Sequence, residues 1–160
     1  MDLNLNPIET LEGELLILKI NYKKFGINRI ELPIAKENYT LSLTWDNRLD
    51  IFHLTIHTGY GFENAVPDKY YKLLSFINEH ISLGHFEISS EENEIRYRHS
   101  LKDISQLCYD KKNFLIKASI ERTLIEMGLY YDVFEKLSSG EKTALEVFKE
   151  VFPSFKSTVQ

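Results

Sequence analysis

The stretch "LSFINEHISLGHFEISSEENEIRYRHS" (residues 74–100) decides the fold of this chain. It holds the end of an apolar helix, a glycine at Gly84, and two short segments, "HFEIS" and "EIRYRHS", on either side of the polar loop "SEEN". Pro67 and Asp68 are typical of a first helical turn, and Gly84 is expected to end this helix in a left-handed conformation. The two segments predict a β-hairpin. The histidines and charged side chains raise the alternative of a metal or acid/base site.

The chain before this stretch predicts one helix and three strands. Pro7 at the start and Gly26 past the end indicate a helix between them, although the run "ELLILKI" would also suit a strand. "RIELPIA" is expected to form a strand, and Pro33 would place it at a sheet edge because proline has no N–H to donate. "NYTLSLTW" and "IFHLTIHT" alternate apolar and polar residues with period two and are joined by "DNRLD", which predicts a hairpin.

The chain after this stretch predicts a long helix over residues 113–137 and a short last helix, "EKTALEVFKEVF". In the long helix, apolar residues recur at three- and four-residue steps. The predicted order is a helix, three strands, a helix, two strands, a long helix and a short helix. The fold class is therefore α+β, with helices packed on an antiparallel sheet of about five strands. We expect one domain over residues 1–152 and a flexible tail over residues 153–160.

The composition is that of an ordinary globular protein, and it argues against several classes of partner. The 160 residues are 43% hydrophobic and 27% charged, and the formal net charge is −5. Affinity for a nucleic-acid duplex depends on Lys and Arg that neutralise phosphates, so an acidic chain with only isolated lysine pairs is not expected to bind one. The one cysteine, Cys108, allows no internal disulfide, and the first residues lack a signal-peptide pattern. The apolar runs are shorter than the ~20 residues that span a bilayer. We expect a cytoplasmic protein without membrane contact.

The histidines and the cysteine form no recognisable catalytic or metal-binding pattern. His53 and His57 lie four residues apart on a predicted strand, which separates them by roughly 13 Å, too far to share one ion. His80 is expected near a helix C-terminus and His85 at the start of a strand, where a site with Glu87 is a less favoured alternative. The cysteine has neither a glycine-rich elbow nor a histidine close to it in the sequence. The sequence predicts no catalytic residue, metal site or cofactor, and so no enzyme.

Two arginines of the second hairpin are the best candidates for a ligand or partner surface. Arg96 and Arg98 point away from the strand face that carries His99, and their guanidinium groups could bind a carboxylate or phosphate. His85 and His99 are the histidines closest to them in the predicted hairpin. The favoured alternative is that the arginines pair across the hairpin with glutamates such as Glu87.

Two further polar features are expected to be structural. Asn78 lies on the same side of its helix as Leu74 and Ile81, and a buried amide must have hydrogen-bond partners. It is therefore expected to tie the helix to a neighbouring loop or strand. Glu91 and Glu92 fall in the hairpin loop and are most simply solvated.

The motif "LLSFINEHISLGHFEI" followed by "IRYRHSL", in this order of elements, resembles the YbjN family of bacterial proteins. The resemblance covers residues 30–147 and is strongest over residues 73–101. It includes the Val66–Pro67 helix start and the Tyr130–Tyr131 pair of the long helix. The residues that carry the family motif, and to which it assigns a structural role, are Trp45, Asn78, Gly84, His85 and Phe86.

This resemblance implies a fold similar to that of type III secretion chaperones. It also implies a regulator of sensory transduction or stress that acts through protein contacts, with no established enzyme activity. An unidentified protein partner is expected, and self-association as a homodimer is an alternative. The other functional hypothesis is a small-anion sensor that holds its ligand with Arg96, Arg98 and a histidine.

Overall fold

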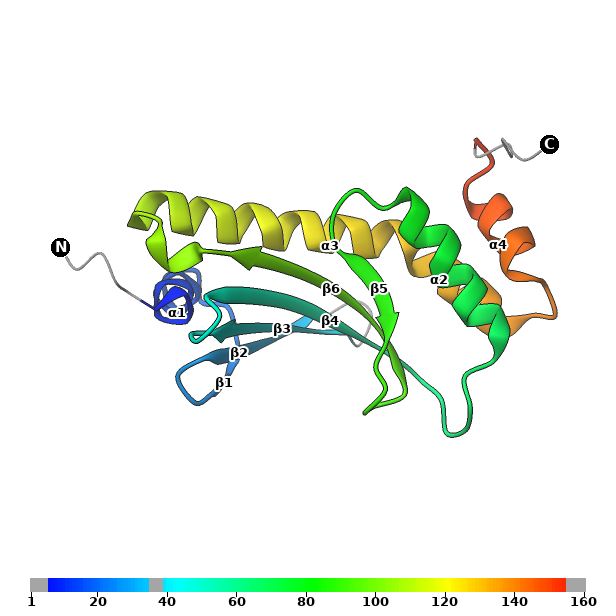
Figure 1. The fold of residues 1–160 in the computed structure, drawn as a ribbon, viewed down its shortest axis with the longest axis horizontal. Coiled ribbons are helices and arrows are strands. Elements are labelled where there is room, and N and C mark those ends of the chain that lie inside the picture. The colour runs from blue at the N-terminus through cyan, green and yellow to red at the C-terminus, as the bar shows by residue number, and fades with distance from the viewer. Residues whose placement is uncertain (1–5, 35–38, 155–160) are drawn as a thin grey trace.

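The computed structural model describes residues 6–34 and 39–154, so most of the predicted C-terminal tail lies outside the described residues. These residues form a six-stranded antiparallel sheet with helices packed over one of its faces (Figure 1). In chain order the elements are α1 (Pro7–Ile17), β1 (Lys23–Phe25), β2 (Arg29–Ile34), β3 (Tyr39–Asp46), β4 (Ile51–Gly61), α2 (Asp68–His80), β5 (His85–Ile88), β6 (Glu94–Lys102), the 3-10 helix η1 (Ile104–Gln106), α3 (Tyr109–Ser139) and α4 (Ala144–Val151). No helix in these ranges is both long and apolar enough to cross a bilayer. The α+β class and the order of the predicted elements are confirmed, with one strand more than expected.

The strand order is β1-β2-β3-β4-β6-β5, and each neighbouring pair is antiparallel. The period-two pattern of the sequence separates the two faces of this sheet. One row across four strands consists of side chains that are all buried, namely Leu41, Ile56, Tyr97 and Phe86. This inner face forms the core together with the helices. The opposite face carries polar side chains.

The helices cover the inner face from end to end. Helix α3 runs along the length of the sheet, and its buried stripe includes Ile116, Met127 and Phe134. At one end α1 packs against α3 and β3, and at the other α2 and α4 pack against each other and α4 against α3 (Figure 1). The three- and four-residue spacing of the apolar residues therefore places α3 on the sheet as the sequence predicts.

The first helix is shorter than the sequence predicts. It ends at Ile17, and two residues further on Lys19 adopts a positive φ of 54°. The amide of Lys19 donates to the carbonyl of Leu16, and the amide of Ile20 donates to the carbonyl of Leu15. These two bonds make a Schellman motif, which satisfies carbonyls at the helix end without a glycine.

Gly26 therefore does not end a helix. It lies in the turn between β1 and β2 with a φ of +64°, a conformation in which glycine carries no steric penalty. The segment before it forms β1, the strand that the prediction of about five strands omits. Strand β1 pairs with β2 only from Arg29 to Glu31, so β2 has no β1 partner at Pro33, consistent with the edge position expected for this proline.

The link between α2 and β5 is held by two residues of the quoted stretch. Asn78 donates from Nδ2 to the carbonyl of Phe86 at 2.9 Å and accepts from the amide of Phe86 at 2.8 Å. This confirms that Asn78 ties its helix to a strand, and it also satisfies backbone groups of β5, the edge strand. Exposed strand edges of this kind otherwise invite pairing with another chain.

Gly84 lies in the turn of this link and not at the helix end, because α2 already ends at His80 and Ile81 is extended. Its φ of +70° confirms the predicted left-handed conformation. A Cβ at this position would lie 2.5 Å from Oη of Tyr97 and 2.6 Å from the carbonyl oxygen of Arg98. Oη of Tyr97 donates to the carbonyl of Leu83 at 2.5 Å, and burial raises the pKa of this hydroxyl to about 12. The position thus requires glycine for both conformation and space.

Candidate functional site

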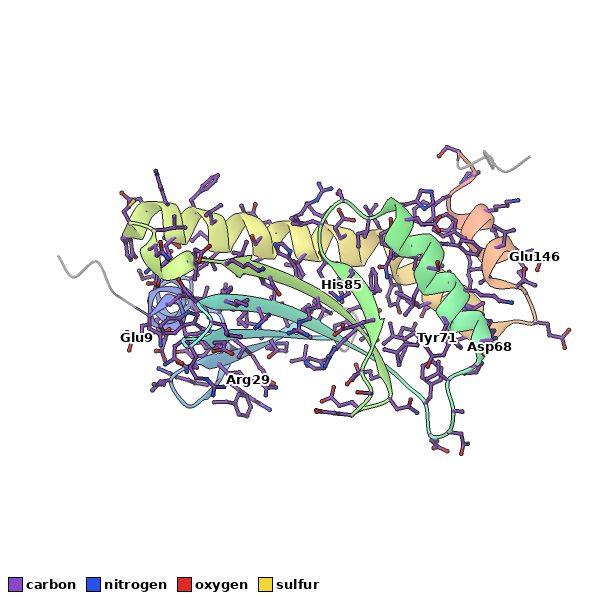
Figure 2. All side chains as sticks on the ribbon, in the orientation of Figure 1. Glu9, Arg29, Asp68, Tyr71, His85 and Glu146 are labelled. Carbon is purple, nitrogen blue, oxygen red and sulfur yellow. The ribbon has the colours of Figure 1, made fainter. Side chains whose placement is uncertain are left out.

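The first candidate surface is the polar face of the sheet, on the side opposite the helices. One row of this face runs across β3, β4, β6 and β5 through Thr40, His57, Arg96 and Glu87. The next row on the same face places His85 opposite Arg98, and His85 lies on the edge strand β5 (Figure 2). The register therefore brings together three of the four residues predicted for a ligand or partner surface.

Glu87 is the centre of this group. Nε of Arg96 lies 2.6 Å from its Oε1, Nη1 of Arg98 lies 3.9 Å from the same oxygen, and Nε2 of His85 lies 3.1 Å from Oε2. Burial raises the pKa of the Glu87 carboxyl, but hydrogen bonds from Arg96 and His85 outweigh this and keep its pKa below the ordinary value. The favoured cross-strand pairing is present, and a bound anion would have to compete with Glu87.

The fourth predicted residue, His99, does not join this group. It lies opposite Leu54 in the pairing of β4 with β6, on the inner face of the sheet. Burial lowers the pKa of its imidazole and so favours the neutral form of this side chain. A site that contains Arg96, Arg98 and His99 together cannot form on one side of this sheet.

Trp45, the remaining residue of the family motif, has a structural contact. Its Nε1 donates to Oδ1 of Asp50 at 3.3 Å, and Asp50 accepts from the amide and the hydroxyl of Ser105 at 3.1 and 2.7 Å. Asp50 has a positive φ of 50° in the turn between β3 and β4. Trp45 and Asp50 thus connect this turn to η1, which leads into α3.

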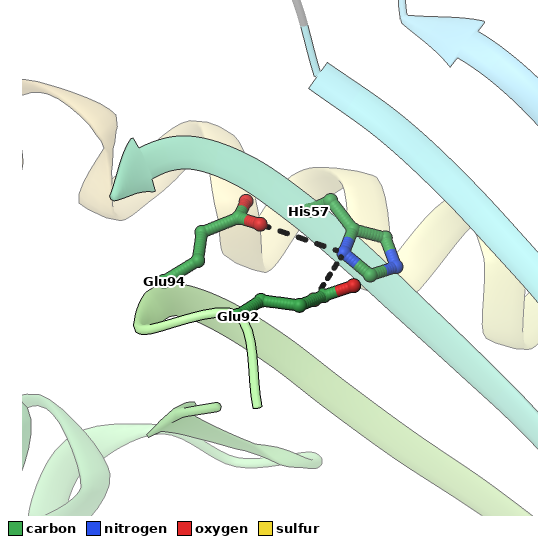
Figure 3. A group of neighbouring side chains, drawn as sticks. All are labelled: His57, Glu92 and Glu94. Atoms are coloured by element: carbon green, nitrogen blue, oxygen red, sulfur yellow. Dashed lines mark ion pairs between the residues drawn. The ribbon is translucent and has the colours of Figure 1, made fainter. Parts of the chain in front are cut away.

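The two histidines of β4 point to different partners, as their spacing on a strand predicts. Nδ1 of His53 lies 2.8 Å from Oγ of Ser100, and Nη2 of Arg98 lies 3.4 Å from the same nitrogen. His57 instead faces two glutamates of the β5–β6 turn region, Glu92 and Glu94 (Figure 3). These three residues could together hold a metal ion. The sequence did not predict this group, because Glu92 was expected to be a solvated residue of the hairpin loop.

The second candidate surface is an apolar groove between α1, β2 and α3. Its volume is about 570 Å³, within the range of protein ligand pockets. It is lined by Leu11, Glu14, Leu15, Leu18, Ile20, Leu32, Pro33, Ile34, Leu41, Lys117, Ile120, Glu121 and Leu124. Ten of these thirteen side chains are apolar, counting Pro33, so the groove can take apolar side chains but offers few polar groups to orient a small molecule.

Two of the three polar residues that line the groove, Glu14 and Lys117, form a salt bridge along one side. Oε2 of Glu14 accepts from Nζ of Lys117 at 2.8 Å, and Oε1 accepts from Nδ2 of Asn113 at 3.2 Å. The hydrogen bond from Lys117, with the second from Asn113, lowers the pKa of Glu14. This bridge joins α1 to α3 and sets the distance between the two helices that bound the groove.

The sequence pointed only indirectly to this groove. The ambiguous run "ELLILKI" leaves Leu18 60% exposed and Ile20 45% exposed, because α1 ends before them. Leu16 and Ile17, inside α1, are exposed as well, so this apolar run presents side chains to solvent both before and after the helix end. The feature of the sequence that could have indicated the groove is this apolar run, which is longer than one face of a helix can bury.

Comparisons with known proteins identify the fold. No family model matches the sequence, and no curated protein matches it. Among solved structures, a chain of the ExsC-ExsE complex is similar, with a TM-score of 0.58 and 13% identity over 81% of this chain and 94% of that chain. YbjN from E. coli is also similar, with a TM-score of 0.51 and 13% identity over 77% of this chain and 90% of that chain. The chain thus has a YbjN-like fold, as the sequence resemblance implied.

Proposed function

We propose that this protein is a non-enzymatic, chaperone-like regulator that binds an apolar segment of a partner protein in the groove between α1, β2 and α3. The observation that carries the proposal is the groove itself, in which ten of the thirteen lining side chains are apolar. Contiguous exposed apolar surface costs free energy in water and is typical of an interaction site.

The two edges of the sheet differ in a way that favours this groove as the partner-binding surface. At the β5 end, Asn78 satisfies the backbone groups of Phe86. At the other end, β2 extends past its pairing with β1, and the side chains of this extension, Leu32 to Ile34, line the groove. A partner segment would therefore meet apolar side chains and an open strand end at the same place.

The comparisons support a role in protein binding. One similar fold was crystallised in the ExsC-ExsE complex, and YbjN is described as a candidate transcription regulator. Neither description names an enzyme. A cytoplasmic location and a regulatory role in bacteria are part of the same proposal, as is a single functional domain over residues 1–152.

A matched pair of variants tests the groove. Leu124 lines it and is 38% exposed, whereas Leu145 is 43% exposed and lies on α4, beyond the groove residues. Leu124→Glu should abolish capture of the partner from source cytosol, measured by quantitative mass spectrometry, and Leu145→Glu should retain it. Both variants should keep the wild-type circular dichroism spectrum. Equal capture by the two variants would place the binding surface elsewhere.

Self-association is a second mode that one observation favours. Helix α3 leaves Phe114, Ile125 and Leu129 exposed, three large apolar side chains whose spacing of 11 and 4 residues places them on one face of the helix. A homodimer would cover them. Light scattering should then give twice the chain mass of 18.8 kDa, and Ile125→Glu should return the chain to a monomer. A monomeric wild-type protein would exclude this mode.

A further inference from the structure

Three side chains of metal-ligating types meet at the end of the polar sheet face (Figure 3). Nδ1 of His57 lies 3.5 Å from Oε2 of Glu92 and 3.7 Å from Oε2 of Glu94. One ligand atom from each residue lies within 4.8 Å of the other two. We propose that these three residues bind a divalent transition-metal ion, with Zn²⁺ as the best fit.

The distances suit tetrahedral coordination. Zinc binds histidine nitrogen and carboxylate oxygen at roughly 2.0–2.2 Å, so two ligands on a tetrahedron lie roughly 3.3–3.6 Å apart. The separation of His57 from Glu92 falls in this range, and that of His57 from Glu94 lies just above it. Glu92 lies in the turn between β5 and β6 with 51% of its side chain exposed, so it is free to close on an ion. Three protein ligands leave one corner for water.

A β-bulge orients the second glutamate. The register between β4 and β6 shifts between His57 and Gly61, and Gly59 within this interval has a φ of +71°. The amide of Gly59 donates to Oε1 of Glu94 at 2.7 Å, which leaves Oε2 facing His57. Bulges commonly redirect side chains at functional sites, and a hydrogen bond of this kind fixes a ligating carboxylate.

The turn that carries Glu92 is held on both sides. Asn93, with a positive φ of 53°, donates from Nδ2 to the carbonyls of Phe62 and Asn64 at 2.5 and 2.7 Å. Its amide donates to the carbonyl of Ser89 at 2.8 Å. The backbone from which Glu92 extends is therefore positioned before any ion binds, which lowers the ordering cost of binding.

The local charge also suits a cation. His57 is opposite Arg96 in the sheet, but the guanidinium of Arg96 is turned to β5, where it donates to Glu87 at 2.6 Å and to Ser89 at 3.4 Å. Glu92 and Glu94 both lie within ion-pair distance of the one imidazole of His57. Two carboxylates beside one imidazole leave a negative charge that a divalent ion would balance. A nitrogen and two oxygens are ligands that zinc accepts.

Zinc titration calorimetry on the metal-stripped, tag-free full chain tests the proposal. The wild type should bind one Zn²⁺ saturably, and His57→Ala and Glu92→Gln should each weaken binding by at least ~10-fold. Glu91→Gln is the control for Glu92→Gln because it alters the neighbouring residue of the same turn. His85→Ala is the control for His57→Ala because His85 also faces a glutamate on this face. Both controls should bind as the wild type does.

Cobalt substitution provides a second readout, because tetrahedrally coordinated Co²⁺ absorbs visible light intensely. This absorption should appear when Co²⁺ is added to the wild type and should be absent in His57→Ala. The proposal is overturned if no saturable Zn²⁺ binding occurs up to about 1 mM, or if His57→Ala binds as tightly as the wild type. Because Glu92 is largely exposed, Glu92→Gln decides the question even if His57→Ala fails to fold.

Discussion

Replacing Gly84 with alanine should destabilise the protein more than the same change at a glycine with equal backbone strain but open surroundings. Gly84 has a φ of +70°, and an added Cβ would lie 2.5 Å from Oη of Tyr97 and 2.6 Å from the carbonyl oxygen of Arg98. Gly26 has a φ of +64° with no atom within 4 Å of an added Cβ. The pair therefore separates the cost of the conformation from the cost of the close approach.

The magnitudes follow from these two contributions. The left-handed conformation costs a non-glycine residue about 1–2 kcal/mol, which both variants would bear. Inserting a methyl group into packed surroundings adds about 1–3 kcal/mol, and it would fall on Gly84→Ala alone. Displacing Tyr97 would also weaken its hydrogen bond to Leu83, worth about 1 kcal/mol. We expect a loss of ~1–2 kcal/mol for Gly26→Ala and ~3–6 kcal/mol for Gly84→Ala.

Urea unfolding followed by circular dichroism measures both values, with the m-value checked for constancy. For a chain of 160 residues each kcal/mol lowers Tm by about 2–4 °C, so the two variants should differ by at least about 4 °C. Equal destabilisation of Gly84→Ala and Gly26→Ala would refute the argument from close approach. It would show that Tyr97 and the β6 backbone can move aside at no cost.

Three further predictions follow from side-chain contacts. Asn78→Leu removes both hydrogen bonds to the backbone of Phe86 and should lower the free energy of unfolding in urea by about 2–4 kcal/mol. An unchanged urea midpoint would show that these two hydrogen bonds do not stabilise the fold. The folded-state pKa of Glu87 is lowered, so its stabilisation is present above its ordinary pKa of 4.5 and is lost as the pH falls through the folded value. The difference in unfolding free energy between wild type and Glu87→Gln should therefore shrink as the pH falls below 4.5, and a difference that does not change with acidification would contradict this. Because Glu87 already contacts both arginines, the wild type should bind inorganic phosphate no tighter than about 1 mM. Tighter binding that the Arg96→Ala, Arg98→Ala double variant loses would instead favour the anion-sensor hypothesis.

The sequence carried local information about the site as well as about the fold. Period-two alternation placed Arg96 and Arg98 on one strand face and His99 on the other, because side chains of a strand alternate by geometry alone. The same geometry separated His53 from His57. The pairing of Arg96 with Glu87 was predictable because a short hairpin limits the register.

Long-range register was not available from the sequence. His57 faces Glu92 and Glu94 because β4 pairs with β6 and a bulge near Gly59 redirects the chain. His57 lies more than thirty positions from either glutamate in the sequence, and no local pattern specifies where a bulge occurs. The groove was hidden for a similar reason, since the end of α1 depends on a left-handed Lys19 that replaces the usual glycine.

The sequence by itself determined the class of fold, the order of its main elements, the role of Asn78 and the left-handed conformation of Gly84, because hydrophobic periodicity, buried amides and positive φ act over short stretches of chain. Only the tertiary structure decided the sixth strand, the groove between α1 and α3, and the meeting of His57 with two glutamates. Each of these depends on how distant segments pack together, and the free energy of that packing is shared among many residues, so no single stretch of sequence encodes it.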